Sequence, residues 1–450
     1  MPRGSTPVKV ACLAILLFAG AGADGPRARR ARFAELQPVI DAHAAIAPAE
    51  LRAAAGPARD QRWAGWIAGR NREIRARLAR GDEDTIVNWM LFGSSFTSQP
   101  PAVTASRQDQ AAEARRVATL MRARAQDLVR ALAAPSRDER IRFARSLFEA
   151  RGLSFDSDAG RAAVLQYLIE SVVRVANEQD RIDFRTRGLS LDTSLAPNFA
   201  IEQALAAMKA GGLLRGGAVR RVAIVGPGLD FSDKDSGFDF YPQQSLQPFA
   251  VVDSVRRLQL GAGNIDVVVL DISPRVIDHV NRATERAAKG EGYTLHLPLA
   301  RQREWLPPFR GYWQQFGNQI GVIVPAAAPR SVAASAELRA VRVHADLVQR
   351  VTVSDLNIVT DRLDGDGFDL ILATNVFVYY DLFDQALALA NVTSMLRPGG
   401  FFLSNTPMPD LGGTTLHLTG SNEVTYWRGQ PSGDGMPPAF GDRLFWYQRR

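Results

Sequence analysis

In the stretch Arg221-Val-Ala-Ile-Val-Gly-Pro-Gly-Leu-Asp230 a run of apolar residues stops abruptly at two glycines set one residue apart, and the predicted fold follows from this pattern. Val222 to Val225 predict a strand that is buried on both faces, and the following Gly-Pro-Gly predicts a tight turn. A strand that ends in a Gly-rich turn often seats a nucleotide-type cofactor, since the missing Cβ lets backbone N–H groups approach the ligand. A helix that begins after the turn would add the positive end of its dipole.

Downstream of this stretch, short apolar runs alternate with helical segments, as in a parallel sheet that is covered on both faces. The tail predicts late strands that are partly antiparallel. The predicted strands are 222–225, 265–271, around 351–354, 368–375 and 401–404; the predicted helices are about 245–260, 275–289 and one after residue 380.

Upstream, from about Arg32 to Gly217, the chain is rich in Ala and Arg and has helical periodicity. Ser136 and Glu139 form a capping-box pattern at the start of one such helix. The length of 450 residues also favours more than one domain. We therefore predict a signal-like or anchor segment at 1–23, a linker at 24–58, a helical domain at 59–217, and an α/β domain at 218–450 with an insertion at 293–338.

The insertion 293–338 is unusually aromatic for a connection inside a compact domain. Loops of that length are usually functional or disordered, and the aromatic content favours an ordered lid over a flexible tether. A surface elaboration without a role in the site is the alternative interpretation.

The charge and the metal-ligand types exclude several classes of function. The net charge is +7, but the arginines are spread along helices that also carry acids, so we do not favour nucleic-acid binding. Cys12 is the only cysteine and the five histidines show no paired spacing, which argues against zinc. The acidic loop Phe231–Gln244 misses the EF-hand pattern because Gly237 comes too late. We expect no metal.

A glycine turn follows the first predicted strand, and a polar residue stands at or just after the end of each of the next three. These residues are Asp271 at the end of the second strand, Asp355 after the third and Asn375 at the end of the fourth. The carboxyl ends of parallel strands open on one edge of a sheet, so these residues converge on one crevice. Together with Met395-Leu-Arg-Pro-Gly-Gly-Phe401, this ordered set resembles the class I S-adenosylmethionine-dependent methyltransferases. The stretch 368–380 is similar to the corresponding part of chemotaxis-receptor methyltransferases.

The resemblance covers about Arg220 to the C-terminus. It implies a Rossmann-like, mostly parallel sheet with helices on both faces, preceded by the helical domain, and S-adenosylmethionine as cofactor. It implies that the glycine turn lies close to the methionine end of the cofactor and that Asn375 borders the sulfonium. It also implies that Asp271 accepts hydrogen bonds from both ribose hydroxyls and that Asp355 accepts one from the adenine amino group. The implied cofactor-binding residues are Gly226, Pro227, Gly228, Asp230, Asp271, Ile272, Asp355, Leu356 and Asn375; the catalytic candidates are Asn375 and Tyr379.

Two positions depart from the family pattern. Family members usually carry an acid where this chain has Ile224, and a small residue where it has Asp230. The missing acid normally helps to hold the methionine ammonium group, and Asp230, Asp233 or Asp235 are the candidates to replace it. The spacing from Gly228 to Asp271 is also longer than the usual twenty or so residues.

We predict methyl transfer from S-adenosylmethionine to an unidentified acceptor. A non-enzymatic protein that binds S-adenosylmethionine or S-adenosylhomocysteine is the alternative, and an NAD-linked oxidoreductase is less favoured because the third glycine of G-x-G-x-x-G is missing. At the N-terminus, Arg3 and Lys9, an apolar run and Ala21-Gly-Ala23 have the form of a signal peptide. Residues 10–23 therefore suggest export or membrane association, whereas the cofactor favours a cytoplasmic catalytic domain.

Overall fold

The computed structural model describes residues 28–52, 57–102, 110–179, 184–233, 236–365, 367–408, 412–429 and 438–450. The predicted signal segment 1–23 lies outside these residues. The helices are α1 (Phe33–Ala42), α2 (Ala49–Arg52), α3 (Pro57–Phe92), α4 (Gln110–Ala133), α5 (Glu139–Ala150), α6 (Asp158–Gln179), α7 (Ala196–Ala210), α8 (Gln247–Arg257), α9 (Pro274–Ala288), α10 (Pro307–Gln315), α11 (Ala345–Val348) and α12 (Leu382–Met395), with 3-10 turns η1 (Phe184–Thr186) and η2 (Phe377–Tyr379).

The strands belong to three sheets, of which the eight-stranded one has the order β5-β12-β13-β11-β10-β2-β3-β8. The strands are β1 (Ala28–Arg30), β2 (Val219–Val225), β3 (Gly261–Asp271), β4 (Tyr293–Ala300), β5 (Glu304–Trp305), β6 (Gly321–Val324), β7 (Ala336–Val343), β8 (Val351–Asp355), β9 (Asp361–Leu363), β10 (Phe368–Ala373), β11 (Leu396–Ser404), β12 (Leu416–Arg428) and β13 (Ala439–Arg449).

Five neighbouring strands of the large sheet, β8, β3, β2, β10 and β11, are parallel. Numbered along the chain they have the order 3-2-1-4-5 of a doubly wound sheet, with a switch point beside β2. The antiparallel strand β13 then separates β11 from β12. The predicted fold class is confirmed: a Rossmann-like sheet of the class I methyltransferase type, preceded by a helical N-terminal region.

The central strands are apolar throughout because both of their faces are buried. In β2, Val222 and Ile224 pack in one hydrophobic cluster with α7, α8 and α9, whereas Ala223 and Val225 pack in a second cluster with α1 and α12. The same alternation holds in β3 and β10. This two-sided burial explains why a run of adjacent apolar residues, not an alternating one, marked the strand in the sequence.

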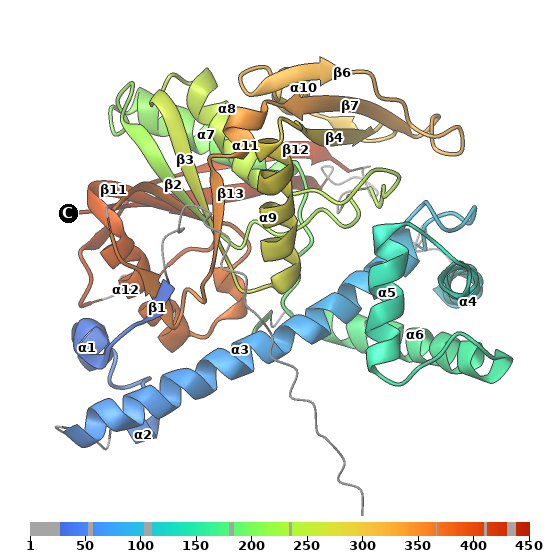
Figure 1. The fold of residues 1–450 in the computed structure, drawn as a ribbon, viewed down its shortest axis with the longest axis horizontal. Coiled ribbons are helices and arrows are strands. Elements are labelled where there is room, and N and C mark those ends of the chain that lie inside the picture. Colours follow the sequence, from blue (N-terminus) through green and yellow to red (C-terminus); the bar gives the residue numbers. More distant parts are fainter. Residues whose placement is uncertain are drawn as a thin grey trace, which may run out of the picture.

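Helix α3 joins two parts of the molecule. Trp63, Ile67 and Ile74 in its first half pack in the cluster beneath the sheet, while Trp89 and Met90 near its end pack with α4, α5 and α6 in a separate helical cluster. Figure 1 shows α3 as one long helix, with α1 and α2 near one end and α4 to α6 near the other. The predicted helical segment 59–217 therefore contributes to more than one core, and its last helix, α7, covers the sheet.

The insertion forms its own three-stranded antiparallel sheet, β4-β7-β6, with α10 beside it (Figure 1). Its aromatic side chains Trp305, Phe309, Tyr312 and Trp313 are buried. They pack on the sheet domain through Phe199 of α7, whose ring centroid lies 5.6 Å from that of Phe309. This segment is ordered because its aromatic side chains have a hydrophobic surface to cover.

The helix expected at about 245–260 is α8 (Gln247–Arg257), which a long loop separates from the glycine turn. One local expectation was wrong. The helix expected to begin at a Ser136 capping box has Asp138 as its N-cap, whose side chain accepts from the backbone N–H groups of Arg140 and Ile141. Ser136 instead accepts from the N–H of Asp138 at 3.1 Å.

The first described residues are fixed to the sheet domain. Strand β1 pairs with β9, and Arg29 forms ion pairs with Glu35 and Asp364. Arg29 thus has structural partners among the described residues. Among the described residues, no helix is both long and apolar enough to cross a membrane.

Candidate functional site

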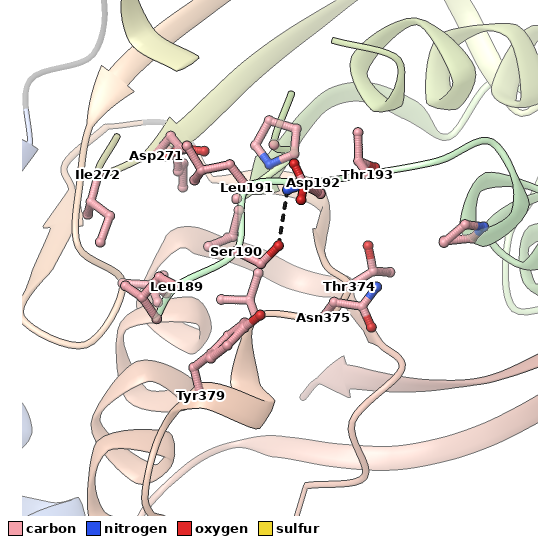
Figure 2. A pocket seen from close by; sticks show the side chains of 18 of the residues that line it. Leu189, Ser190, Leu191, Asp192, Thr193, Asp271, Ile272, Thr374, Asn375 and Tyr379 are labelled. Atoms are coloured by element: carbon pink, nitrogen blue, oxygen red, sulfur yellow. Dashed lines mark hydrogen bonds between the residues drawn. The ribbon is translucent and has the colours of Figure 1, made fainter. Parts of the chain in front are cut away.

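The carboxyl edge of the parallel sheet opens on a cavity of about 390 Å³. Its walls come from β2, β3 and β10 and the residues after them, from the segment before α7, from Leu78 of α3, and from β12 and β13. The lining residues lie at 78, 189–194, 196–197, 225–228, 270–272, 356, 358, 374–376, 379–380, 426 and 442. Figure 2 shows several of these side chains around the cavity.

The glycine turn lines this cavity, and both glycines have a conformation that other residues avoid. Gly226 and Gly228 have φ values of 60° and 69°. A Cβ on Gly228 would lie 2.2 Å from the carbonyl oxygen of Leu191, and a Cβ on Gly226 would lie 2.9 Å from a methyl group of Val376. Gly228 therefore lets the segment before α7 pass close by, and Gly226 leaves room for Val376; sequence reasoning foresaw neither contact. Pro227 also lines the cavity.

Asp271 ends β3 at the cavity wall and is only 4 % exposed. Its Oδ1 accepts from the backbone N–H of Ser273 at 2.8 Å, but its buried Oδ2 has no hydrogen-bond partner. Burial raises the pKa of Asp271 to about 7, although the N–H groups of Ser273 and Ile272 lower it. An unpaired buried acceptor is costly, so a ligand that donates a hydrogen bond to Oδ2 is expected to bind here.

Beside the glycine turn lies a carboxylate that the sequence analysis missed. Asp192 lines the cavity, and its backbone forms a parallel bridge with Leu229. The Leu229 N–H donates to the carbonyl of Leu191 at 2.8 Å, and the hydroxyl of Thr85 lies 3.3 Å from each carboxylate oxygen of Asp192. This segment is short and lies outside the motifs of the sheet domain, so only its contact with the turn reveals it.

The first turn of α7 also borders the cavity through Ala196 and Pro197. Proline in the first turn is typical of a helix start, since the N–H that it lacks would have no partner within the helix. The N-terminal end of a helix carries a partial positive charge. One wall of the cavity thus combines the Asp192 carboxylate with the positive end of α7.

The two catalytic candidates, Asn375 and Tyr379, both line the cavity. Asn375 has a φ of 57°, and its N–H and Oδ1 are each paired with the Asn405 side chain at 2.8 Å. Burial raises the pKa of Tyr379, and Arg77 lies over its ring at 5.8 Å. Neither side chain is therefore arranged as a general base at neutral pH; both are held in fixed positions at the wall.

Ile272 and Leu356 line the cavity as predicted, but Asp355 does not. Asp355 points to Arg75 of α3, whose Nη2 lies 2.5 Å from its Oδ1. The same guanidinium donates to the carbonyl of Ile272 at 3.2 Å. Arg75 of α3 thus connects the end of β8 with the residue that follows β3. The carboxylate of Asp355, which was expected to bind an adenine ring, forms an ion pair instead.

Asp230 also lies outside the cavity lining, and it is only 2 % exposed. Its carboxylate accepts from the Tyr241 hydroxyl at 3.0 Å and from Gln244 Nε2 at 2.8 Å. Gln244 in turn bonds the backbone of His296 in the insertion. Asp230 therefore ties the loop after the turn to the insertion.

The other acids proposed for this loop are no closer to the site. Asp233 is not among the cavity-lining residues, and Asp235 lies outside the described residues. Asp239, from the same loop, accepts from the Trp89 indole and from the hydroxyls of Ser94 and Ser95. No residue of 293–338 lines the cavity either, so the insertion supports the site from a distance.

The fold and this cavity define a class of protein: a methyltransferase-type α/β domain with a binding crevice at the switch point. No family model matches the chain, and no curated protein matches it significantly. Among solved structures it is similar to the N-methyltransferase NodS from Bradyrhizobium japonicum WM9, with 13 % identity over 55 % of this chain and 94 % of that one, at a TM-score of 0.25.

It is also similar to magnesium protoporphyrin IX methyltransferase (ChlM) from Synechocystis PCC 6803 with bound SAM, with 9 % identity over 56 % of this chain and 79 % of that one, at a TM-score of 0.26. A third similar structure is TehB from Haemophilus influenzae, with 10 % identity over 55 % of this chain and 62 % of that one, at a TM-score of 0.23.

Proposed function

We propose that this protein binds S-adenosylmethionine in the sheet-edge cavity and transfers its methyl group to an acceptor. The observation that carries the proposal is the unpaired Oδ2 of Asp271, buried at the end of β3 beside the glycine turn. A ribose offers two neighbouring hydroxyl donors, and hydrogen bonds to a carboxylate are among the stronger ones in proteins. Ile272 and Leu356, both at the same end of the cavity, supply apolar surface for the adenine ring.

The methionine end of the cofactor is a zwitterion, and the wall beside the glycine turn is polarised to match it. Asp192 would accept from the ammonium group, and the N-terminal end of α7 would face the carboxylate. Asp192 then takes the place of the acid missing at Ile224, which is fully buried between the sheet and its helices. This replacement comes from a segment that precedes the first strand, not from the loop after it.

The same wall disfavours a dinucleotide. In NAD-binding folds the pyrophosphate sits at the N-terminus of the helix that directly follows the glycine turn. Here that helix is delayed to Gln247, and the carboxylate of Asp192 lies beside the turn. A pyrophosphate would meet a negative charge where it needs N–H donors.

Methyl transfer from a sulfonium requires few catalytic groups from the protein. A methyl sulfonium is already activated, so the chain has to bind it, align it with a nucleophile and exclude water. Asn375 and Tyr379, held by Asn405 and Arg77, would form the wall near the sulfonium. No side chain is assigned as a general base.

Titration calorimetry with S-adenosylhomocysteine tests the binding step. We expect binding to the native protein, and Asp271→Asn to weaken it roughly 10- to 100-fold, since the amide cannot accept from both hydroxyls as a carboxylate does. Asp266→Asn is the matched control, because Asp266 lies on the same strand but is exposed and pairs with Arg350. Binding of NAD without S-adenosylhomocysteine would overturn the proposal.

Transfer of a radioactive methyl group from S-adenosylmethionine into a small-molecule extract separates an enzyme from a binding protein. An enzyme labels a product, and Asp271→Asn labels less of it than Asp266→Asn does. Binding of S-adenosylhomocysteine without any transfer would leave the non-enzymatic alternative.

A further inference from the structure

The cavity is longer than the cofactor site just described. From β3, where Asp271 lies, to β12, where Tyr426 lies, the sheet order crosses five strand spacings. At about 4.8 Å per spacing this corresponds to roughly 24 Å along the carboxyl edge. A cofactor seated over β3, β2 and β10 leaves the end near β12 and β13 to another molecule. In the proposed function that molecule is the methyl acceptor.

The polar groups at that end are acidic. Asp442 of β13 lines the cavity, and the Tyr426 hydroxyl donates to its Oδ2 at 2.6 Å. Within the described part of the chain, this is the only hydrogen bond recorded for the Asp442 side chain, so its other oxygen can accept from a ligand. Tyr426 is itself fixed by packing, with its ring centroid 5.8 Å from that of Phe309 in the insertion.

Charge across the whole cavity points the same way. Its charged lining residues are Asp192, Asp271 and Asp442, and the described lining contains no Lys, Arg or His. The unpaired, buried Oδ2 of Asp271 independently marks the cavity as a ligand site. In the proposed function the cofactor engages Asp192 and Asp271, so an anionic acceptor at the far end would meet the carboxylate of Asp442 and no Lys, Arg or His of the described lining, whereas a cationic one would be attracted to Asp442.

We infer that the methyl acceptor is a small amine-bearing cation, and that Asp442 binds its charged group while a neutral amine nitrogen receives the methyl. This inference rests on the proposed function. The nitrogen lone pair forms the new N–C bond as the S–C bond breaks. The electron pair of the S–C bond stays on sulfur, so the sulfonium becomes a thioether and the positive charge passes to nitrogen. An N–H proton then leaves to solvent.

The first experiment makes no assumption about the particular amine. A small-molecule cell extract is split by ion exchange into cationic, neutral and anionic fractions, and each is incubated with the full-length protein and labelled S-adenosylmethionine. We expect label in the cationic fraction only, and its loss when the amines are acetylated beforehand. Label in the anionic fraction, label released by alkali as a methyl ester, or no label despite binding of S-adenosylhomocysteine would each overturn the inference. Failure to bind S-adenosylhomocysteine would instead overturn the proposed function.

The second experiment tests Asp442 with the cationic fraction as acceptor. Asp442→Asn keeps an oxygen for the Tyr426 hydroxyl but removes the charge, so we expect KM for the amine to rise at least tenfold with kcat and S-adenosylhomocysteine affinity little changed. Glu423→Gln is the matched control, since Glu423 lies on the same hairpin but is exposed and pairs with Arg443. An equal KM in both variants would overturn the role of Asp442.

Discussion

Two buried aspartates flank the glycine turn, and they show how similar electrostatics can serve different purposes. Asp230, after β2, and Asp271, after β3, are 2 % and 4 % exposed, and burial raises the pKa of each to about 7. Asp230 has donors on its carboxylate from Tyr241 and Gln244, whereas Asp271 keeps one oxygen without a partner at the cavity. A raised pKa alone does not identify a ligand site; the unpaired atom does.

The difference between the two follows from what surrounds them. The loop after Asp230 folds back over it, and the insertion completes the enclosure through Gln244 and His296. Asp271 ends its strand at the sheet edge, where neighbouring parallel strands end too. Asp230 therefore maintains the structure, and Asp271 is available to a ligand.

The largest expected effect is the loss of stability in Asp230→Ala. The substitution leaves the buried Tyr241 hydroxyl without its acceptor and removes one acceptor of Gln244, so we expect unfolding to cost about 4 kcal/mol less at pH 5. Denaturant unfolding measures the change, with Asp266→Ala as the exposed control. A loss below about 1 kcal/mol would show that Asp230 is not a structural residue and would reopen a role in binding.

The second prediction concerns pH. Each aspartate has a pKa of about 7 in the folded state, against 3.8 as the ordinary value. Between these values the folded protein holds more protons than the unfolded chain, so stability falls as pH rises from 4 to 7. Between pH 5 and pH 8 each group should remove up to about 3 kcal/mol from the unfolding free energy.

Denaturant unfolding at pH 5 and at pH 8 measures this loss in the wild type, in Asp230→Asn and in Asp271→Asn. Each variant lacks one titrating group and should lose less stability than the wild type. Parallel behaviour of all three proteins would contradict the raised pKa values.

The third prediction sharpens the contrast at Asp271. At pH 5 the carboxyl is mostly protonated and resembles an amide, so Asp271→Asn should change stability there by less than about 1 kcal/mol. At pH 8, where Asp271 is ionised, the same substitution should weaken S-adenosylhomocysteine binding. Unfolding is therefore measured at pH 5 and calorimetry at pH 8. A stability loss as large as that of Asp230→Ala would make Asp271 a structural residue as well.

The smallest expected effect comes from Arg75, which fixes the ends of β3 and β8. Arg75→Ala should weaken S-adenosylhomocysteine binding about fivefold, or about 1 kcal/mol, because the wall at Ile272 loses its support. Arg72→Ala, on the exposed side of the same helix, is the control. Tighter binding in Arg75→Ala would show instead that Arg75 competes with the adenine amino group for Asp355.

The sheet and most of the cavity floor could be predicted from the amino-acid sequence. Adjacent apolar residues such as those of β2 can be buried only between two layers, and polar residues at strand ends must meet at one edge once the strands are parallel. Gly226, Gly228, Asp271, Ile272, Leu356 and Asn375 were placed at that edge on this ground, and all of them line the cavity.

Which acids face the cavity depends on packing between distant parts of the chain and could not be predicted from the sequence. Asp192 and Asp442 lie far from the motifs along the chain and reach the cavity through the segment before α7 and through β13. Asp230 and Asp355 lie close to the motifs but are engaged by Tyr241 and Arg75. Spacing along the chain fixes where a strand ends, but long-range packing determines whether a carboxylate keeps a free oxygen or finds a partner.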